Sequence, residues 1–387
     1  VTIAGLAMGT GMSTHSHKVG LFHETVSRYE VVLANGSVVE ATAHNEHVDL
    51  FHALPWSHGS LGFLVSLTLN IVKIKPYIKI TYVPVRGQKK YCDTLRELSG
   101  ARRASAPALQ PDYVEATVFS KDEAVIMAGD YSDYDPKIPV NRCSKWYKPW
   151  FYKHVETFLE KGESTELVPL KDYLLRHNRA IFWVVEDMLS VGNHPIFRLL
   201  CGWLLPPKPA FLKFSTTPGV RAYTFSKQVF QDIVLPLEEL EKQIDKACEL
   251  FDKFPLLVYP CKVWARGPGA GQLRTPPARR LVPGADYAMY NDLGIYGVPG
   301  RVKRREPYDP VAAMREMERF TREVGGFSFL YADIFMSRAE FEEMFDLTLY
   351  EAARRKYGAH GAFPHLYDKV RPEIDVFTIG QEHAISG

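Results

Sequence analysis

Glycine, serine and threonine residues are concentrated in the first twenty positions of the chain. Gly5, Gly9, Gly11 and Gly20 stand among hydroxyl-bearing side chains. Glycine adopts positive φ and lets the backbone approach a ligand closely, while hydroxyl groups donate hydrogen bonds. Successive backbone N–H groups in such a loop form a concavity that suits a pyrophosphate. The pattern favours a phosphate-binding loop, and a glycine-rich turn between two strands is the alternative.

Strands are expected after this stretch. Asn35-Gly36 separates residues 29–33 from residues 37–42, and Asn-Gly between two β-rich runs predicts a hairpin. A further strand from residue 63 alternates in polarity, so that one face would carry Val65, Leu67, Leu69 and Ile71. Residues 1–75 are therefore predicted to be strands joined by glycine turns.

Helices and strands are mixed over the remainder of the chain. Apolar periodicity predicts a helix over Pro236–Phe254, and Asp309-Pro310 begins another with proline at the first helical position. Residues 327–335 are predicted to form a strand, followed by a capping box at residues 337–340. The other expected strands are 113–119, 124–129, 256–259 and 287–294.

The composition excludes several classes of protein. The 387 residues suffice for two domains, and a net charge of +2 gives no reason to expect nucleic-acid binding. Five cysteines without a C-x-x-C pair favour free thiols in a reducing compartment over a zinc site or a disulfide framework. Aromatic residues gather in 145–214, which suits an apolar ligand pocket or a membrane interface; a large core with an irregular loop is the alternative.

Several motifs resemble the Δ24-sterol reductases, which belong to the vanillyl-alcohol-oxidase type of FAD-binding proteins. The likeness covers about residues 1 to 370, and Ala4 departs from it by replacing the first of two adjacent glycines. The motifs are Gly5-Leu6-x-Met8-Gly9-Thr10-Gly11, Ser16-His17-Lys18-x-Gly20-Leu21-Phe22, Pro55-Trp56-Ser57-x-Gly59-x-Leu61-Gly62-Phe63, Gly202-Trp203-x-x-Pro206-Pro207-Lys208 and Leu330-Tyr331-Ala332-Asp333.

The resemblance implies an α+β fold. Residues 1–75 would form the C-terminal half of a PCMH-type FAD-binding domain, and residues 76–335 a mixed sheet-and-helix substrate (cap) domain. Residues 336–387 would form a C-terminal helix and tail. Because the chain begins at Val1 inside a glycine motif, we expect a fragment that lacks the family's N-terminal membrane segment and the first half of its FAD domain.

The resemblance also implies an activity. The expected reaction is reduction of the side-chain Δ24 double bond of a sterol, such as desmosterol to cholesterol, with NADPH and non-covalent FAD. A flavin-dependent oxidase or dehydrogenase of another apolar substrate is one alternative. A non-catalytic, membrane-associated protein that binds sterol or FAD is another. No metal is expected, and the implied location is the endoplasmic reticulum membrane, with the Golgi as a second location.

Site residues are implied on the matching positions. Reduction of a double bond that no carbonyl polarises needs a proton donor, and Tyr331 is the first candidate and Glu115 the second. The basic clusters Arg176-His177-x-Arg179 and 301–305 are candidates for the NADPH phosphates, with a solvated face as the alternative for 301–305. The FAD-binding stretch would be Thr2, Ile3, Ala4, Gly5, Leu6, Ala7, Met8, Gly9, Thr10, Gly11, Met12, Ser13 and Thr14.

Overall fold

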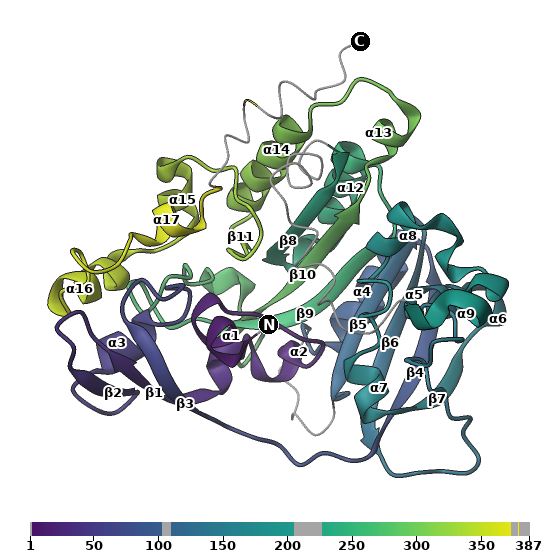
Figure 1. Cartoon of the computed structure of the whole chain (residues 1–387), viewed down its shortest axis with the longest axis horizontal. Coiled ribbons are helices and arrows are strands. Elements are labelled where there is room, and N and C mark those ends of the chain that lie inside the picture. Colours follow the sequence, from purple (N-terminus) through teal and green to yellow (C-terminus); the bar gives the residue numbers. More distant parts are fainter. Residues whose placement is uncertain (1, 103–109, 205–226, 373–377, 379–387) are drawn as a thin grey trace.

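The computed structural model describes residues 2–102, 110–204, 227–372 and 378 (Figure 1). Val1, Pro206-Pro207-Lys208 and most of the tail after Arg371 lie outside the described residues. Two antiparallel sheets and a set of mostly short helices form an α+β fold, as predicted. Within the described ranges, no helix is long and apolar enough to cross a membrane.

The larger sheet has eight strands in the order β11-β8-β10-β9-β5-β6-β4-β7, and all neighbours are antiparallel. The predicted strand over residues 327–335 is wrong in length, because only two of its residues pair with β8. The strands are β4 (Tyr77–Arg86), β5 (Tyr113–Ser120), β6 (Glu123–Ser132), β7 (Ser164–Pro169), β8 (Val229–Pro236), β9 (Leu256–Trp264), β10 (Tyr287–Gly297) and β11 (Phe327–Ser328).

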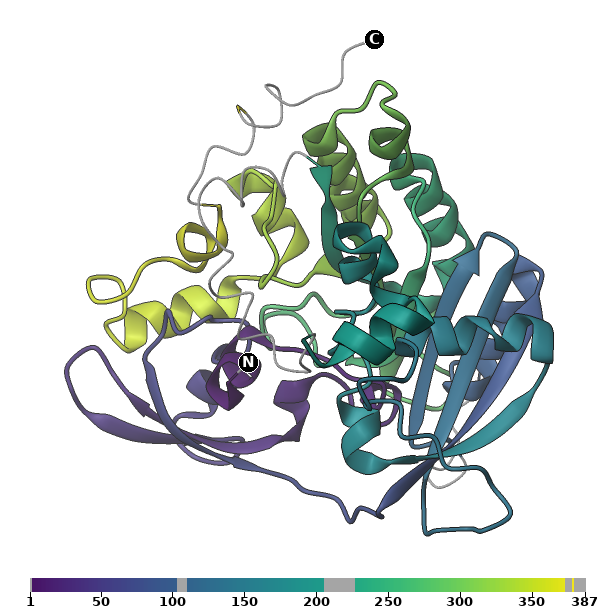
Figure 2. The ribbon, with the colours of Figure 1, turned by 45° about the vertical axis from the view of Figure 1, so that its right-hand side comes forward.

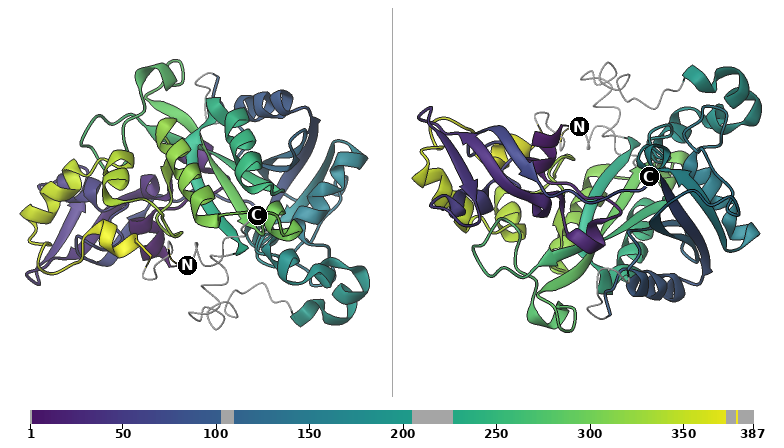
Figure 3. Two further views of the ribbon diagram at one scale, coloured as in Figure 1. Left: turned by 90° about the horizontal axis from the view of Figure 1, so that it is seen from above. Right: turned by 90° about the horizontal axis from the view of Figure 1, so that it is seen from below.

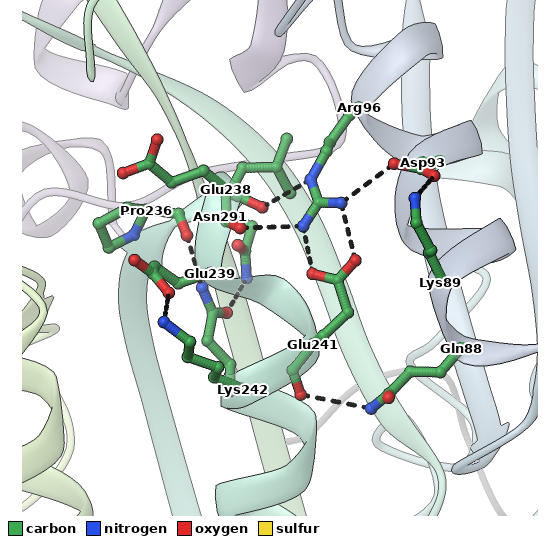
Figure 4. A network of polar contacts seen from close by, with 12 residues as sticks. Gln88, Lys89, Asp93, Arg96, Pro236, Glu238, Glu239, Glu241, Lys242 and Asn291 are labelled. Atoms are coloured by element: carbon green, nitrogen blue, oxygen red, sulfur yellow. Dashed lines mark hydrogen bonds and ion pairs between the residues drawn. The ribbon is translucent and has the colours of Figure 1, made fainter. Parts of the chain in front are cut away.

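Three amphipathic helices cover one face of this sheet: α4 (Gln88–Leu98), α12 (Leu240–Phe251) and α14 (Pro310–Glu323). Ile244 of α12 and Met317 of α14 belong to the same core as Ile233 and Leu293 of the strands. Arg96 ties α4 to the start of α12, since it pairs with Glu241 and donates to backbone carbonyls before that helix (Figure 4). The helix predicted over Pro236–Phe254 is present as α12 but is shorter, because β8 extends to Pro236 and the helix ends at Phe251, and the predicted start of α14 at Asp309-Pro310 is confirmed.

The smaller sheet has three strands in the order β2-β1-β3. The predicted hairpin is confirmed: β1 (Val26–Val32) and β2 (Val38–Thr42) pair on either side of Asn35-Gly36. β3 (Phe63–Leu69) pairs with β1 through a bulge at Val65. Because a bulge shifts the alternation, Leu64 packs on the core and Val65 is exposed, so the predicted single apolar face is wrong there.

The first and last parts of the chain share one core. The smaller sheet packs with α15 (Arg338–Met344), α16 (Thr348–Lys356) and α17 (Leu366–Val370), and the capping box that begins α15 is confirmed. Figure 3 shows both parts at the same end of the molecule. An extended connection over residues 70–76 leads from this end to the larger sheet (Figure 2). The division at residues 75 and 335 stays a prediction.

The remaining helical segments are short. They pack around the second face of the larger sheet and at the edges of both sheets, and the longest has seven residues. They are α1 (Ile3–Gly9), α2 (Ser16–Val19), η1 (Phe22–Thr25), α3 (Val48–Ala53), α5 (Phe151–Glu156), α6 (Phe158–Lys161), α7 (Leu170–Leu174), α8 (Val184–Met188), η3 (Ser190–Asn193), α9 (Pro195–Cys201), η4 (Gly202–Leu204), η6 (Leu237–Glu239), η7 (Ala278–Arg280) and α13 (Gly300–Arg304).

Candidate active site

The second face of the larger sheet carries polar side chains on neighbouring strands. Successive side chains of a strand point to opposite faces, so residues next to those in the helix-covered core point the other way. Asp232 of β8 shares this face with Phe230 and Val234, and Asp292 of β10 shares it with Tyr290 and Tyr296. Ionisable groups in the interior of a sheet require partners or a function.

Asp232, Asp292, Tyr296 and Tyr331 form one group, which we call the carboxyl cluster. Asp232 lies opposite Gly294 in the strand register, and Asp292 lies opposite Val234. The Tyr296 hydroxyl donates to Oδ1 of Asp232, and the Tyr331 phenol also hydrogen-bonds to the Asp232 carboxyl. One carboxyl group therefore has two phenol partners.

The missing side chain of Gly294 makes this arrangement possible. A Cβ at this position would lie 2.5 Å from the Tyr296 hydroxyl. That distance is far shorter than an ordinary van der Waals contact. Glycine at position 294 thus lets the Tyr296 ring cross the strand and reach Asp232.

Burial opposes the charged state of every group in the cluster. Desolvation raises the pKa of Asp232 to about 6 and raises the pKa of Asp292 well above its usual range, where the nearby Asp232 charge adds to the effect. The pKa of Tyr296 and that of Tyr331 are also raised by burial and by these carboxyl groups. Neither aspartate forms an ion pair within the described part of the chain, and Oδ1 of Asp292 has no hydrogen-bond partner there.

Tyr331 lies in the turn after β11 and connects the buried cluster to the surface. Its ring is 56% exposed, while its hydroxyl group reaches Asp232. The ring stacks on Phe329 at 5.1 Å between centroids, and Phe329 stacks on Trp56 at 5.7 Å. This aromatic stack joins the carboxyl cluster to the Pro55–Phe63 motif. The role of Tyr331 as proton donor stays a prediction, and the contact of its hydroxyl group with Asp232 agrees with that role.

Glu115 lies in a different group on β5. Its carboxyl accepts from Nε of Arg176 at 3.0 Å and is 3.4 Å from Nε2 of His177. Although burial opposes the charge, the Arg176 guanidinium and His177 lower the pKa of Glu115 to about 2. An ionised carboxylate accepts a proton and does not donate one, so these contacts do not favour the predicted donor role of Glu115.

The predicted basic clusters differ in exposure. Arg176 and Arg179 are 8% and 5% exposed. Arg176 pairs with Glu115, and Arg179 donates to the carbonyls of residues 145, 146 and 148. These engaged guanidinium groups do not favour contact with NADPH phosphates. In the second cluster, Lys303 pairs with Asp187 and Arg304 with Glu306.

Aromatic rings connect the Glu115 group to the carboxyl cluster. Phe182 stacks on His177 at 4.7 Å and on Tyr296 at 5.1 Å between centroids. The Tyr259 hydroxyl lies 3.3 Å from Nε2 of His177, and Tyr259 is the register neighbour of Asp292. Aromatic rings therefore link the two groups across the second face of the sheet.

The predicted FAD-binding stretch is placed beside this face. The loop expected there is wrong for Ile3–Gly9, which forms α1 with Thr2 as its cap. Met12 packs against the buried aromatic residues around Tyr296, and the Thr14 carbonyl accepts a hydrogen bond from the Val114 amide at 2.8 Å. The hydroxyl of Thr14 already contacts Tyr173, and that of Thr10 contacts His23. Binding by the stretch stays a prediction.

Unpartnered polar atoms next to α1 fit a bound group. Within the described residues, Nε1 of Trp56, Oγ of Ser57 and Nε2 of His58 are buried without a hydrogen-bond partner. The His58 amide donates to the Met8 carbonyl at 3.0 Å, and its ring packs over Gly9. Burial lowers the pKa of His58 to about 4, so the ring is neutral. Buried polar atoms need partners, and a polar cofactor beside α1 would supply them.

Sequence reasoning did not identify Asp232, Asp292 or Tyr296. A weak signal was present, because each aspartate interrupts an otherwise apolar strand, Val229–Pro236 or Tyr287–Gly297. Its meaning depends on pairing across the sheet, which one strand does not reveal. Among the described residues, no group of His, Cys, Asp and Glu is arranged to hold a metal ion.

Comparison with known proteins gives a consistent result. No family model matches the chain. A Delta(24)-sterol reductase of Rattus norvegicus is 39% identical over 371 residues, which cover 96% of this chain and 68% of that protein. One of Arabidopsis thaliana is 36% identical over 95% of this chain and 67% of its own length. The FAD-dependent monooxygenase FUP4 of Fusarium proliferatum (strain ET1) is 37% identical over 71 residues, 18% of this chain and 14% of that protein.

Proposed function

The chain belongs to the Delta(24)-sterol reductase family, and from this membership we propose that it reduces the side-chain Δ24 double bond of a sterol, for example desmosterol to cholesterol. The observation that carries the proposal is the position of Tyr331. This residue lies within a motif of the family resemblance, and its phenol hydrogen-bonds to Asp232, close to the buried Asp292. Protonated groups in this position suit the protonation of a carbon atom.

The proposal includes two cofactors, FAD held without a covalent bond and NADPH. Bound FAD supplies the hydride after it has been reduced by NADPH. The backbone of Thr2–Thr14 and the polar atoms of residues 56–58 would hold the flavin nucleotide, because the latter are buried without partners. The short match to an FAD-dependent monooxygenase also supports a flavin.

The residues of the chain have two tasks in this reaction. An isolated double bond has no carbonyl group through which charge can be stabilised, so a proton must be delivered directly to carbon. Tyr331 is the proposed donor. Buried rings of the same face, among them Trp183 and Tyr296, exclude water and offer an apolar surface to the sterol side chain.

We place the protein at the endoplasmic reticulum membrane, with the Golgi as the second location. An exposed apolar patch on η3, α9 and η4 supports contact with a lipid surface. The six side chains of the patch are each 53–64% exposed. Exposed Trp146 and Tyr147 and the cation Lys145 lie in the adjoining loop, which contacts η4 at Gly202. Apolar, aromatic and cationic groups together are typical of a membrane interface. The patch consists of Val191, Ile196, Leu199, Leu200, Trp203 and Leu204.

An anaerobic titration of the intact protein tests the proposed function. We expect a yellow flavin band that bleaches with NADPH and returns when desmosterol is added. Bleaching without return would contradict the sterol substrate and favour another apolar substrate of a flavin enzyme. The absence of any flavin band would contradict the enzyme and leave a binding protein.

A further inference from the structure

We propose that Asp232 and Asp292 hold one exchangeable proton between them and deliver it through Tyr331 to the carbon atom that is reduced. The inference rests on the proposed reductase function and names the acid that this function needs. Asp232 and Asp292 would act as a pair, Tyr331 would be the catalytic residue that touches substrate, and Tyr296 would be a positioning residue.

The first step of the argument is the geometry of the pair. Asp232 and Asp292 project from adjacent strands to the same face, two positions apart along the register, as Asp232 lies opposite Gly294 and Asp292 opposite Val234. Asp292 is 3% exposed, and no ion pair to either carboxyl occurs within the described residues. Two carboxyl groups at such a site cannot both ionise, because burial and mutual repulsion oppose the second charge. One proton therefore stays on the pair at neutral pH.

Among the described residues, the groups that face the pair are neutral acids at pH 7 and supply no compensating charge. Burial raises the pKa of each of them, and Asp232 or Asp292 adds to this effect for all except Tyr259. They are Tyr259 and Cys261 of β9, Tyr296 of β10 and Tyr331 of the turn after β11.

The second step concerns acid strength. A phenol whose pKa is raised is a poor acid, and it could not protonate an isolated double bond if a free phenolate had to form. The proton of the pair, which reaches the phenol through Asp232, removes this difficulty. As the Tyr331 O–H bond breaks and the C–H bond forms, that proton moves to the phenol oxygen. A reduced flavin, when bound, would supply the hydride to the other carbon, and water would later return one proton to the pair.

The third step concerns Tyr296. Its hydroxyl donates to Oδ1 of Asp232, so it holds in place the carboxyl group that Tyr331 also contacts. The Tyr296 ring crosses the strand over Gly294 to make this contact. Tyr296 thus orients the carboxyl group and does not itself need to reach the substrate.

Infrared spectroscopy of the intact protein tests the pair without any cofactor or substrate. A protonated carboxyl group has a C=O stretch that a carboxylate lacks. We expect this band at pH 7 and expect Asp292→Asn to remove a part of it, while Asp232→Asn and Tyr331→Phe retain it. The buried Glu318 carboxyl accepts a hydrogen bond from the Phe335 amide on the helix-covered side of the sheet. The Glu318→Gln variant is the matched control, because it removes a neutral carboxyl group that lies outside the site. An unchanged band in Asp292→Asn would overturn the proposal.

Rapid kinetics then test delivery. In Asp292→Asn we expect the reduction of bound flavin by NADPH to keep its rate and the later reoxidation by sterol to slow by about 100-fold, as for loss of a general acid. In Tyr331→Phe we also expect only the reoxidation by sterol to slow, whereas in Glu318→Gln both rates should stay unchanged. Equal rates in Asp292→Asn and the unaltered protein would overturn the proposal. If the unaltered protein does not react with sterol, the proposed function fails, whereas the infrared test of the pair still stands.

Discussion

At the residue scale, buried carboxyl groups in this chain differ in charge because their neighbours differ. Glu115 is 1% exposed and ionised, since Arg176 and His177 contact it. Glu318 is 2% exposed, and burial raises its pKa to about 8, although the Phe335 amide donates a hydrogen bond to it. The same side chain thus serves as a structural anion in one place and as a neutral acid in another.

The Glu115–Arg176 pair gives the first prediction. Replacement Arg176→Met leaves a buried carboxylate without its cation and should lower the free energy of unfolding by about 3–5 kcal/mol. Urea unfolding measures this change. The exposed pair Lys75–Asp133 is the control, and Lys75→Met should cost less than about 1 kcal/mol. A similar small cost for Arg176→Met would contradict the assigned ion pair.

Glu318 gives a prediction about pH. Its folded-state pKa of about 8 exceeds the unfolded-state value of about 4.3. Between these two pKa values the folded state binds more protons than the unfolded state. The contribution of Glu318 to the free energy of unfolding is therefore fully present at low pH and is lost as the pH rises from about 4 to about 8. Glu318→Gln should remove up to about 1.4 kcal/mol per pH unit of this slope. Unfolding at pH 5 and pH 8 measures it, and parallel profiles of both proteins would refute the assignment.

At the element scale, the sequence predicted those features that depend on neighbours along the chain. The Asn35-Gly36 hairpin, the apolar stripe of α12 and the capping box of α15 each follow from residues within one or two turns. The bulge at Val65 and the short β11 were not predicted, because both depend on the partner strand. Tyr331 could be proposed from its motif, whereas Asp232 and Asp292 become a pair only after β8 and β10 align.

Gly294 gives the prediction that belongs to this scale. In Gly294→Ala the new methyl group meets the Tyr296 hydroxyl, so the ring must move away from Asp232. We expect a stability loss of about 1–3 kcal/mol from overpacking. The sterol half-reaction should slow by roughly 10- to 100-fold because the carboxyl group is no longer oriented.

The control for Gly294 is another glycine. A Cβ at Gly361 would meet nothing within 4 Å, so Gly361→Ala should leave stability and the sterol step unchanged. Stopped-flow absorbance and urea unfolding report on both variants. A sterol step in Gly294→Ala as fast as in Gly361→Ala would refute the positioning role of Tyr296.

At the scale of the whole molecule, the fold brings segments far apart in the sequence into contact and leaves an exposed apolar patch. Trp56 and Phe329 stack at 5.7 Å, and Tyr331 continues this stack to the carboxyl cluster. The apolar patch lies on η3, α9 and η4, at the end of the larger sheet away from the smaller sheet (Figure 1). A sterol is a membrane lipid, so a surface that binds the bilayer would bring the enzyme to its substrate.

The apolar patch therefore gives the last prediction. Replacement of Leu199, Leu200 and Trp203 by glutamate places three anions where apolar groups would enter the lipid, and it should reduce sedimentation with phosphatidylcholine–phosphatidylserine vesicles by about tenfold or more. The exposed Ile71, which is 91% exposed in the connection between the sheets, is the control position, and Ile71→Glu should keep vesicle binding. Reduction of a short-chain, dispersed sterol should persist in the triple variant, since the carboxyl cluster is untouched. Equal vesicle binding by both variants would show that this patch is not the lipid-binding surface.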